Sequence, residues 1–237
     1  MQNIKNVLEK YEYPGRGIIV GLNKTGDEVF FAYFIMGRSL NSKNRFFEMD
    51  EENNLKTKPI KKDMVENEDL IIYTAVTKFK DKIIISNGNH TDTILKGLKE
   101  GKEFKQCLNE TFFEEDPPIL TPRISAVLNL NKNFTYSFSI VKSGGQLCVN
   151  RFFFEYSALK GKGHLIHTYK PKKGNILNSF FGEPTEVLIP QSLKEFEELI
   201  WSGLNLKNKI SLFVCSVNLL TKKQQFKIIN KNIVLKD

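Results

Sequence analysis

Short apolar runs of high β-propensity recur along this sequence, and turn-forming residues separate them. The runs "GRGIIVGL" (15–22) and "EVFFAYFIM" (28–36) are joined by "NKTGD", a connection that suits a β-hairpin. Further strand-like runs lie on both sides of one helical stretch, and they read "RFFEM", "DLIIYTAV" (69–76), "DKIIIS" (81–86), "ISAVLNL", "FTYSFSIV", "QLCVNRFFFEY", "GHLIHTY", "ISLFVCSVNL" and "QQFKIIN". Because the strands do not alternate with helices, the pattern predicts a mixed α+β fold with mostly antiparallel sheets and with helices packed outside two stacked sheets.

Two stretches have the periodicity of amphipathic helices. "TILKGLKEGKEFKQCLNETFF" predicts one or two helices broken near Gly101, and "SLKEFEELIWSG" (192–203) predicts a helix that begins after a Ser cap and closes on a Gly. The chain has no internal repeat, and 237 residues are enough to bury one large core. We therefore expect a single domain over residues 1–237.

The charge distribution limits the kinds of partner. The formal net charge is +8, but the lysines are scattered beside acids or in polar loops, as in "KPIKKDM" and "TKKQQFK". Since the sequence has no basic helix face and no RNA-binding aromatic motif, it favours a small phosphorylated ligand over nucleic acid. A basic RNA-binding module without catalysis is the alternative that this charge leaves open.

Neither a membrane nor a metal is an expected partner. No run approaches the roughly 18 apolar residues of a membrane span, and the N-terminus lacks the apolar centre of a secretory signal. The cysteines Cys107, Cys148 and Cys215 lie far apart with no paired spacing. That spacing argues against a disulfide scaffold and a zinc site, and it fits a reducing cytoplasm.

Arginine is used sparingly and in special places. The chain has only five arginines, and four of them stand beside Gly, Pro, Ser or Asn, in "GRG", "GRSLNSKNR" and "TPR". A guanidinium presents a planar fork that binds phosphate or carboxylate at two points, whereas an ammonium is a hydrated point charge. Arginines at turns of a lysine-rich chain are therefore candidate ligand-binding residues, with pairing to carboxylates or loop carbonyls as the structural alternative.

The stretch "IIISNGNHTDTI" (83–94) is a second candidate. An apolar strand runs into Asn-Gly, and a helix is expected to begin near Thr91 or Asp92. Asn87, Asn89 and His90 would project from the same turn, where exposed amides can bind an anion or a carbonyl. The structural alternative is an ordinary turn followed by a Thr or Asp helix cap.

Several blocks together resemble a known family. "YPGRGIIVG", "YFIMGRSLNSKNR", "DLIIYTAV", "SNGNHTDTI", "TPRIS" and "RFFFEY…GHLIHTY" occur in this order, and they are similar to the archaeal-type inosine monophosphate (IMP) cyclohydrolases and their bacterial relatives. The resemblance covers residues 13–185, and the region after Pro190 contributes little. It implies a four-layer αββα sandwich like that of N-terminal-nucleophile hydrolases. It also implies the last step of purine synthesis, in which a formylated aminoimidazole-carboxamide ribotide closes its second ring and loses water to give IMP.

The resemblance, read with this chemistry, implies a substrate-binding set. A phosphate dianion requires fork donors and loop hydrogen-bond donors, and the reacting groups require an amide donor. The expected substrate-binding residues are Arg38, Ser39, Asn44, Arg45, Asn87 and Arg123. The implied ligands are the nucleotide substrate and IMP, and the reaction requires no metal or redox cofactor.

The resemblance also implies catalytic residues. Tyr73 in "LIIYTA" stands where the family has an active-site tyrosine, and Asn87 would donate to the formyl or carboxamide oxygen. The base, or the group that orients it, is an acid just upstream of "TPR". Glu115 is preferred for this role, with Glu114 and Asp116 left open by a residue of register. Arg123 would either position that acid or bind the phosphate.

The chain also departs from the family pattern. Family members in archaea carry a "YNC"-like string where this chain has Tyr73-Thr74-Ala75, so no cysteine role transfers. The added segment "KPKKGNILNSFFGEP" would either close over the site or mediate association, which leaves a homo-oligomer open. His164 and His167 have no third ligand nearby and are interpreted as structural.

One more class of protein remains as an alternative. An amide hydrolase of the same fold would need Cys, Ser or Thr at a processed N-terminus, and Met1-Gln2 offers none.

Overall fold

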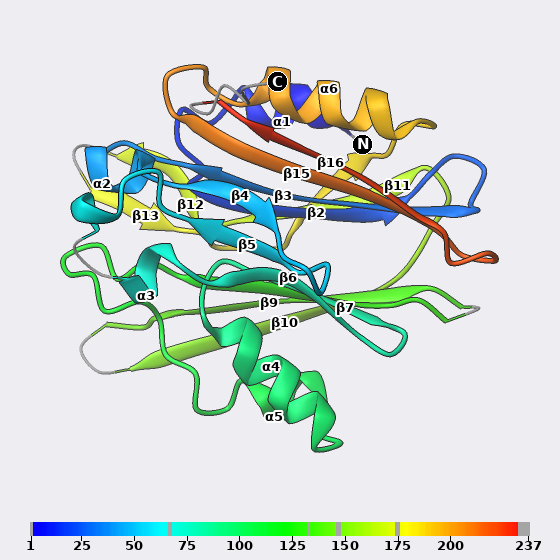
Figure 1. Cartoon of the computed structure of the whole chain (residues 1–237), viewed down its shortest axis with the longest axis horizontal. Coiled ribbons are helices and arrows are strands. Elements are labelled where there is room, and N and C mark those ends of the chain that lie inside the picture. The colour runs from blue at the N-terminus through cyan, green and yellow to red at the C-terminus, as the bar shows by residue number, and fades with distance from the viewer. Residues whose placement is uncertain (1, 66–67, 132, 146–147, 174–175, 232–237) are drawn as a thin grey trace.

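The computed structural model describes residues 2–65, 68–131, 133–145, 148–173 and 176–231. Within these residues two seven-stranded sheets pack face to face (Figure 1). The first sheet has the order β1 (Gln2–Asn3), β14 (Thr185–Leu188), β11 (Lys162–His167), β2 (Arg16–Leu22), β3 (Glu28–Met36), β15 (Lys209–Asn218) and β16 (Gln224–Asn230). The second has the order β10 (Val149–Ser157), β9 (Thr135–Ser143), β8 (Arg123–Asn129), β7 (Lys82–Ser86), β6 (Thr74–Phe79), β5 (Leu55–Lys58) and β4 (Phe46–Met49).

The prediction of mostly antiparallel sheets is confirmed. Among the strand pairs of the described chain, only β1 and β14 run parallel. The predicted hairpin of β2 and β3 is present, with Ile18 opposite Tyr33. Since alternate side chains of a strand point to opposite faces, Arg16 lies on the same face of β2 as Ile18 and Val20. That face belongs to the core between the sheets.

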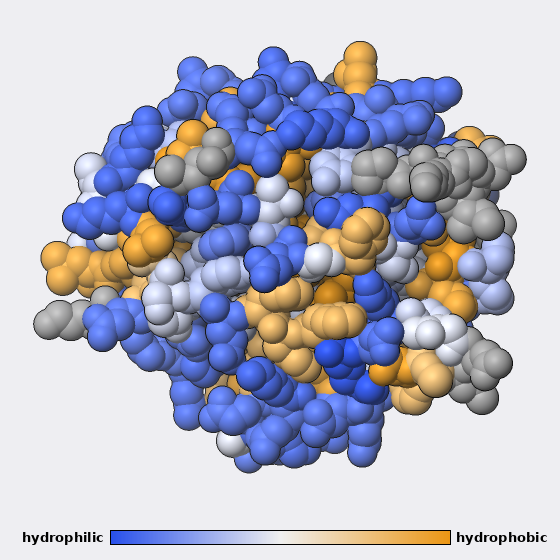
Figure 2. Space-filling view, turned by 180° about the vertical axis from the view of Figure 1, so that it is seen from behind, coloured by the Kyte–Doolittle hydropathy of each residue, from blue (hydrophilic) through white to orange (hydrophobic). Residues whose placement is uncertain are grey.

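Helices cover the outer faces of both sheets. A second apolar cluster joins the first sheet to α1 (Ile4–Leu8) and α6 (Leu193–Gly203), and a third joins the second sheet to α4 (His90–Lys99) and α5 (Phe104–Cys107). Figure 1 shows the two helix pairs on opposite sides of the molecule. The fold is therefore mixed α+β, as the run pattern predicts. Seen from behind, polar side chains cover most of the surface around a few apolar patches (Figure 2).

The two helical stretches follow their local signals. The side-chain oxygen of Ser192 caps α6 by accepting the amide N–H of Glu195. Gly101 has φ +81°, a left-handed conformation that separates α4 from α5 as expected. The predicted cap of α4 at Thr91 or Asp92 is wrong, because the helix begins at His90 after Asn89. The Thr91 hydroxyl bonds instead to Ser86 and to the Gly88 carbonyl.

The prediction of one strand over residues 69–76 is half wrong. A helical turn, α3 (Glu68–Ile71), occupies its first part, and β6 begins only at Thr74. The hydroxyl of Thr57 donates to the carbonyls of Ile71 and Tyr73 and accepts the Tyr73 amide N–H. Together with the Thr57 amide N–H, which donates to the Tyr73 carbonyl at 3.0 Å, this side chain fixes the end of α3 against β5. Tyr73 is buried at the entry to β6.

The added segment after β11 forms a small two-stranded sheet, β12 (Tyr169–Lys173) with β13 (Ile176–Ser179). Residues 174–175 of this segment, which is predicted to close over the site or mediate association, lie outside the described residues. It lies at the end of the molecule where β3 ends and α2 (Leu40–Lys43) follows (Figure 1). No helix among the described residues is both long and apolar enough to cross a membrane.

Candidate active site

A buried ion pair marks the end of the molecule where β2 begins. The guanidinium of Arg16 donates to the carboxylate of Glu114, and both side chains are almost fully buried. Burial alone would lower the pKa of Arg16, but Glu114 and three neighbouring tyrosines raise this pKa well above the usual value. The loop of Glu114 is held by its own amide, which donates to the Thr121 carbonyl at 2.9 Å. Two residues 98 apart in sequence thus form one charged unit.

Two tyrosines lie beside this ion pair. The hydroxyls of Tyr33 and Tyr73 are 2.7 Å apart, and both side chains are buried. Burial, followed by the presence of Tyr73, raises the pKa of Tyr33 well above its ordinary value, so this phenol stays protonated and can donate. Tyr33 comes from β3 of the first sheet and Tyr73 from the entry to β6 of the second. The pair therefore spans the two sheets at the site.

The turn between β7 and α4 supports Arg123. The Arg123 guanidinium donates to the Phe112 carbonyl at 3.0 Å and lies 3.3 Å from the His90 ring nitrogen Nδ1. The other His90 nitrogen, Nε2, is 3.3 Å from the Ile124 carbonyl, so Nε2 carries the proton and Nδ1 accepts. Burial and the adjacent Arg123 lower the pKa of His90 well below its ordinary value. A Cβ at Gly88 would collide with the Arg123 guanidinium, so the glycine leaves the space in which this side chain lies.

Asn87 is buried and bonds to the backbone on both sides of Arg123. Its amide donates to the Pro122 carbonyl at 2.9 Å, and its carbonyl accepts the Ile124 amide N–H at 2.8 Å. These bonds fasten the end of β7 to the start of β8. These bonds support a positioning role for Asn87. The predicted role as an amide donor to the substrate stays a prediction, since an Asn amide carries a second N–H that these bonds do not use.

The loop after β3 brings together the two arginines that bracket it. Arg45 is buried, donates to the Met36 carbonyl at 3.2 Å, and leaves Nε without a partner among the described residues. Arg38 is exposed, and its guanidinium lies 4.8 Å above the ring of Tyr13. The Tyr13 hydroxyl donates to the same Met36 carbonyl at 3.4 Å. Both arginines therefore border one backbone segment.

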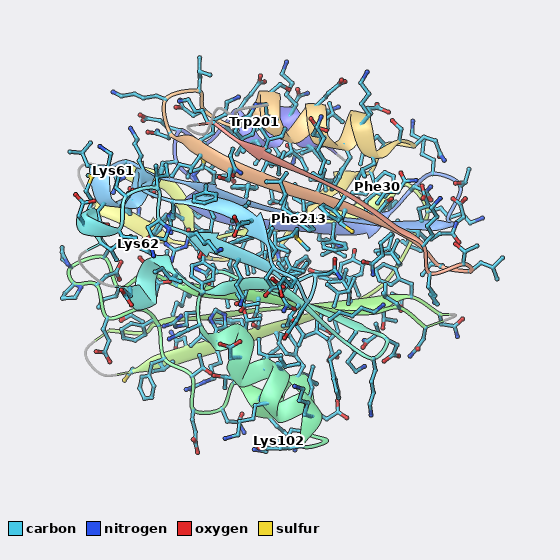
Figure 3. The ribbon with its side chains drawn as sticks, viewed as in Figure 1. Phe30, Lys61, Lys62, Lys102, Trp201 and Phe213 are labelled. Carbon is cyan, nitrogen blue, oxygen red and sulfur yellow. The ribbon has the colours of Figure 1, made fainter. Side chains whose placement is uncertain are left out.

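The two other loop residues predicted to bind substrate hold the loop itself. Ser39 caps α2 through a reciprocal capping box with Ser42. Asn44 is buried, and its amide bonds both the N–H and the carbonyl of Lys61. Figure 3 labels Lys61 at the end of the molecule that also holds α2. In this geometry Ser39 and Asn44 position the arginines.

The structure separates the three acids that the sequence leaves open. Glu114 is buried against Arg16, while Glu115 is exposed. Both carboxylate oxygens of Asp116 accept from Thr121, at 2.6 Å from its amide and 2.5 Å from its hydroxyl. The geometry therefore favours Glu114 over the preferred Glu115 as the acid of the site.

Sequence reasoning gave no role to several residues of this cluster. Tyr169 is buried, and its hydroxyl is 2.5 Å from the Thr121 hydroxyl. Tyr33 is one of many aromatics in an apolar strand. Arg16 is among the four arginines at turns that are candidates for ligand binding, but it is not in the expected substrate-binding set. The sequence signal for Arg16 is its place between two glycines in "GRG". In the structure Gly15 has φ +79°, and a Cβ there would collide with Thr168 and Tyr169.

The remaining histidines and cysteines lie outside the cluster. His164 is 2.7 Å from the Tyr136 hydroxyl, and its ring stacks on Tyr156. His167 is buried, with Nδ1 2.8 Å from the Tyr169 carbonyl. All three cysteines are free. In the described part of the chain, no group of three or more His, Cys, Asp or Glu residues is arranged to hold a metal ion.

The cluster combines the groups that proton transfer at a polar ligand needs. It has one buried carboxylate, the phenols of Tyr33 and Tyr169, whose raised pKa values keep them protonated, and guanidinium donors. Two of these donors, the Nε atoms of Arg16 and Arg45, lack a partner among the described residues. A buried donor without a partner costs free energy, so a bound polar group, either a water or a ligand atom, would stabilise it. The arrangement is suited to an anionic ligand with an exchangeable proton.

Comparison with known proteins adds a family. The sequence model of the family described as "IMP cyclohydrolase-like protein" matches residues 13–223. The IMP cyclohydrolase of Methanocaldococcus jannaschii is 32% identical over 122 residues, which are 51% of this chain and 58% of the relative. The chain thus spans less than two thirds of that relative's length. The family match extends past Pro190 through β15, beyond the region in which the sequence blocks carry the resemblance.

Proposed function

The chain belongs to the IMP cyclohydrolase-like protein family, and on that basis we propose that it catalyses the dehydrative ring closure of 5-formamidoimidazole-4-carboxamide ribotide to IMP. The observation that carries the proposal is the buried Arg16–Glu114 pair beside Tyr73, with guanidinium donors left without a partner in the described chain. The cytoplasm is the proposed location. The two sheets with helices outside them support a single four-layer αββα domain like that of N-terminal-nucleophile hydrolases.

Ring closure joins two groups of one molecule. The carboxamide nitrogen attacks the formyl carbon and loses a proton, and the formyl oxygen gains one to become a hydroxyl. The formamide nitrogen then loses its proton and forms the C=N bond of the new ring as the hydroxyl is protonated and leaves as water. Holding the carboxamide nitrogen against the formyl carbon supplies much of the acceleration, because binding already fixes the orientation that the two groups need in order to react. The site's contribution is a pocket that folds the two substituents of the imidazole together.

Proton transfer is assigned to the buried groups. Glu114 accepts the proton of the carboxamide nitrogen, either directly or through a water, and Arg16 holds this carboxylate in place. Tyr73 donates to the formyl oxygen as it becomes negative, supported by the Tyr33 hydroxyl at 2.7 Å. The Arg16 Nε and Arg123 add positive charge beside the same oxygen.

Substrate binding is assigned to the loop after β3. Arg45 and Arg38 lie on the inner and outer sides of the segment that begins at Met36, so the phosphate would bind between them with a planar fork on each side. Ser39 and Asn44 hold this loop in shape. Asn87 positions Arg123 by fixing the start of β8.

The test is direct. Purified protein is mixed with the formylated ribotide, and IMP formation is followed by ultraviolet absorbance in the presence and absence of a chelator. We expect turnover that the chelator does not change, and we expect none in the folded Glu114→Gln variant. Steeply salt-dependent RNA binding without any turnover would refute the proposal in favour of an RNA-binding module.

A further inference from the structure

We propose that a second pocket, next to the candidate active site, binds the phosphate chain of a nucleoside di- or triphosphate. This pocket, here called the basic pocket, has a volume of about 440 Å³. Its wall contains five cationic side chains and one carboxylate, which are those of Lys10, Arg38, Lys43, Lys170, Lys207 and Glu12. They come from the segment after α1, the loop after β3, the strand β12 and the segment before β15. A volume of this size is within the range of about 300–1,000 Å³ typical of small-molecule sites.

The positive charge of the basic pocket is not neutralised by the protein. Its wall has an excess of four positive charges, and none of the ion pairs among the described residues includes any of the five cations. A concave surface lined by one sign of charge attracts the opposite charge. A monophosphate carries at most two negative charges, which would leave half of this excess unpaired. A di- or triphosphate chain carries three or four and matches it.

The wall of the basic pocket is a built structure rather than a group of free lysines. Asn208 lines it and is buried, and its amide donates to the Glu12 carbonyl at 3.2 Å. The Asn208 carbonyl in turn accepts the amide N–H of Gly37 at 2.9 Å. Three of the four segments are therefore tied together at the base of the pocket. Tyr11 also lines it, and a tyrosine ring is a surface on which any nucleobase can stack.

The basic pocket is coupled to the candidate active site. Tyr13 lines it and stacks on Tyr169 with ring centroids 5.8 Å apart, and the Tyr169 hydroxyl reaches Thr121 in the loop of Glu114. Arg38, to which the proposed function gives the substrate phosphate, also lines the pocket. A bound polyphosphate would therefore compete for Arg38 and inhibit the reaction. This regulatory consequence rests on the proposed function, whereas the binding site itself does not.

The experiment measures binding by titration calorimetry. Adenosine triphosphate, inorganic tripolyphosphate and adenosine monophosphate are titrated into the wild-type chain, into Lys10→Gln/Lys207→Gln, and into the control Lys99→Gln/Lys102→Gln. The control removes the same charge at the far helices α4 and α5 (Figures 1 and 3). We expect one triphosphate per chain and about tenfold weaker binding of the monophosphate, because each charge-assisted hydrogen bond contributes strongly. The pocket variant should lose about tenfold in triphosphate affinity, while the control keeps it.

Three results would overturn the inference. They are the absence of triphosphate binding, equal affinity for mono- and triphosphate, and an equal loss of affinity in the pocket and control variants. Inhibition of ribotide turnover by the triphosphate, with basal turnover unchanged in Lys10→Gln/Lys207→Gln, would support the coupling. A wild-type chain that binds triphosphate but never converts the ribotide would refute the proposed function and leave this site standing.

Discussion

At the scale of single residues, the candidate site depends on where a carboxylate is buried. Glu114 and Glu115 are adjacent and chemically identical, yet only Glu114 meets Arg16 in the interior. A buried ion pair is costly to break, because removing one partner leaves the other charge without compensation. The same substitution at these two positions should therefore have very different consequences.

We expect Glu114→Gln to lower kcat by about 10²- to 10⁴-fold, the usual contribution of a general acid or base. It should also lower the free energy of unfolding by about 3 kcal/mol, because Arg16 remains buried and charged. Glu115→Gln is the matched control and should leave both quantities nearly unchanged. Steady-state kinetics and urea denaturation measure the two effects. A loss of activity in Glu115→Gln alone would reverse the assignment.

Arg38 tests the proposed phosphate clamp. We expect Arg38→Lys to raise KM about tenfold with little change in kcat, because an ammonium keeps the charge but loses the planar fork. An exposed residue that already lies over Tyr13 should contribute little to folding, so the melting temperature serves as the control. An unchanged KM would remove Arg38 from the substrate site.

At the scale of elements, the turn between β7 and α4 positions the side chain of Arg123, the first residue of β8. Gly88 leaves space for the Arg123 guanidinium, His90 accepts from it, and Asn87 fixes the backbone on either side of it. The turn residues Asn-Gly are ordinary for a strand-to-helix connection. Their particular use here depends on a partner that is far away in the sequence.

We expect Gly88→Ala to reduce kcat/KM about tenfold, since the added methyl group displaces Arg123. The double variant Gly88→Ala/Arg123→Ala separates this cause from a general disturbance of the turn. Without the guanidinium the methyl group has space, so the double variant should be no less active than Arg123→Ala alone. A further loss in the double variant would show that Gly88 acts independently of Arg123.

At the scale of the whole molecule, two buried histidines make stability depend on pH. Burial and Arg123 lower the pKa of His90 well below 6.5, and burial lowers the pKa of His167 to about 3. In the unfolded chain both titrate near their ordinary value, so below pH 6.5 the unfolded chain binds more protons than the folded chain. The free energy of unfolding should therefore fall as the pH drops from about 6.5 toward 3, by up to about 1.4 kcal/mol per pH unit for each histidine.

Urea denaturation at several pH values between 5 and 8 measures this dependence. His167→Gln should flatten the slope below pH 6.5, whatever its effect on stability at neutral pH, because glutamine does not titrate. His164→Gln is the comparison and should flatten the slope less, because burial also lowers the pKa of the half-buried His164, but by less than that of His167. A slope that is unchanged in His167→Gln would show that other groups set the acid limit.

The architecture could be predicted from the sequence to the extent that it is local. Apolar runs and turn residues predict β3 and β16 to the residue, because strand and turn propensities act over a few positions. The turn of α3 escaped prediction, since the hydroxyl of Thr57, distant in sequence, holds its end. The order of the elements along the chain predicts the fold class. The assignment of strands to each sheet depends on contacts between distant segments, so local propensities do not predict it.

The candidate site was predictable as a set of segments but not as a set of contacts. The "NG.HTD" and "TPR" blocks meet where Arg123 lies 3.3 Å from His90 Nδ1, and the "GRS…NR" block borders the same buried groups through Arg45, whose charge acts on Tyr33. The roles inside them depend on burial: Asn44 and Asn87 bond to backbone, while Arg45 keeps a free donor. A loop without periodicity gives no signal that distinguishes Glu114 from Glu115.

The Arg16–Glu114 pair joins the first sheet to the loop that leads into the second, and Tyr33 and Tyr73 do the same with neutral groups. If this cluster is the proposed catalytic centre, it works only while the two sheets are docked. A partial separation of the sheets, with every strand still hydrogen-bonded to its neighbours, would already extinguish turnover. On gentle heating, activity should therefore disappear before the far-ultraviolet circular dichroism changes, which makes catalysis a sensitive reporter of sheet docking.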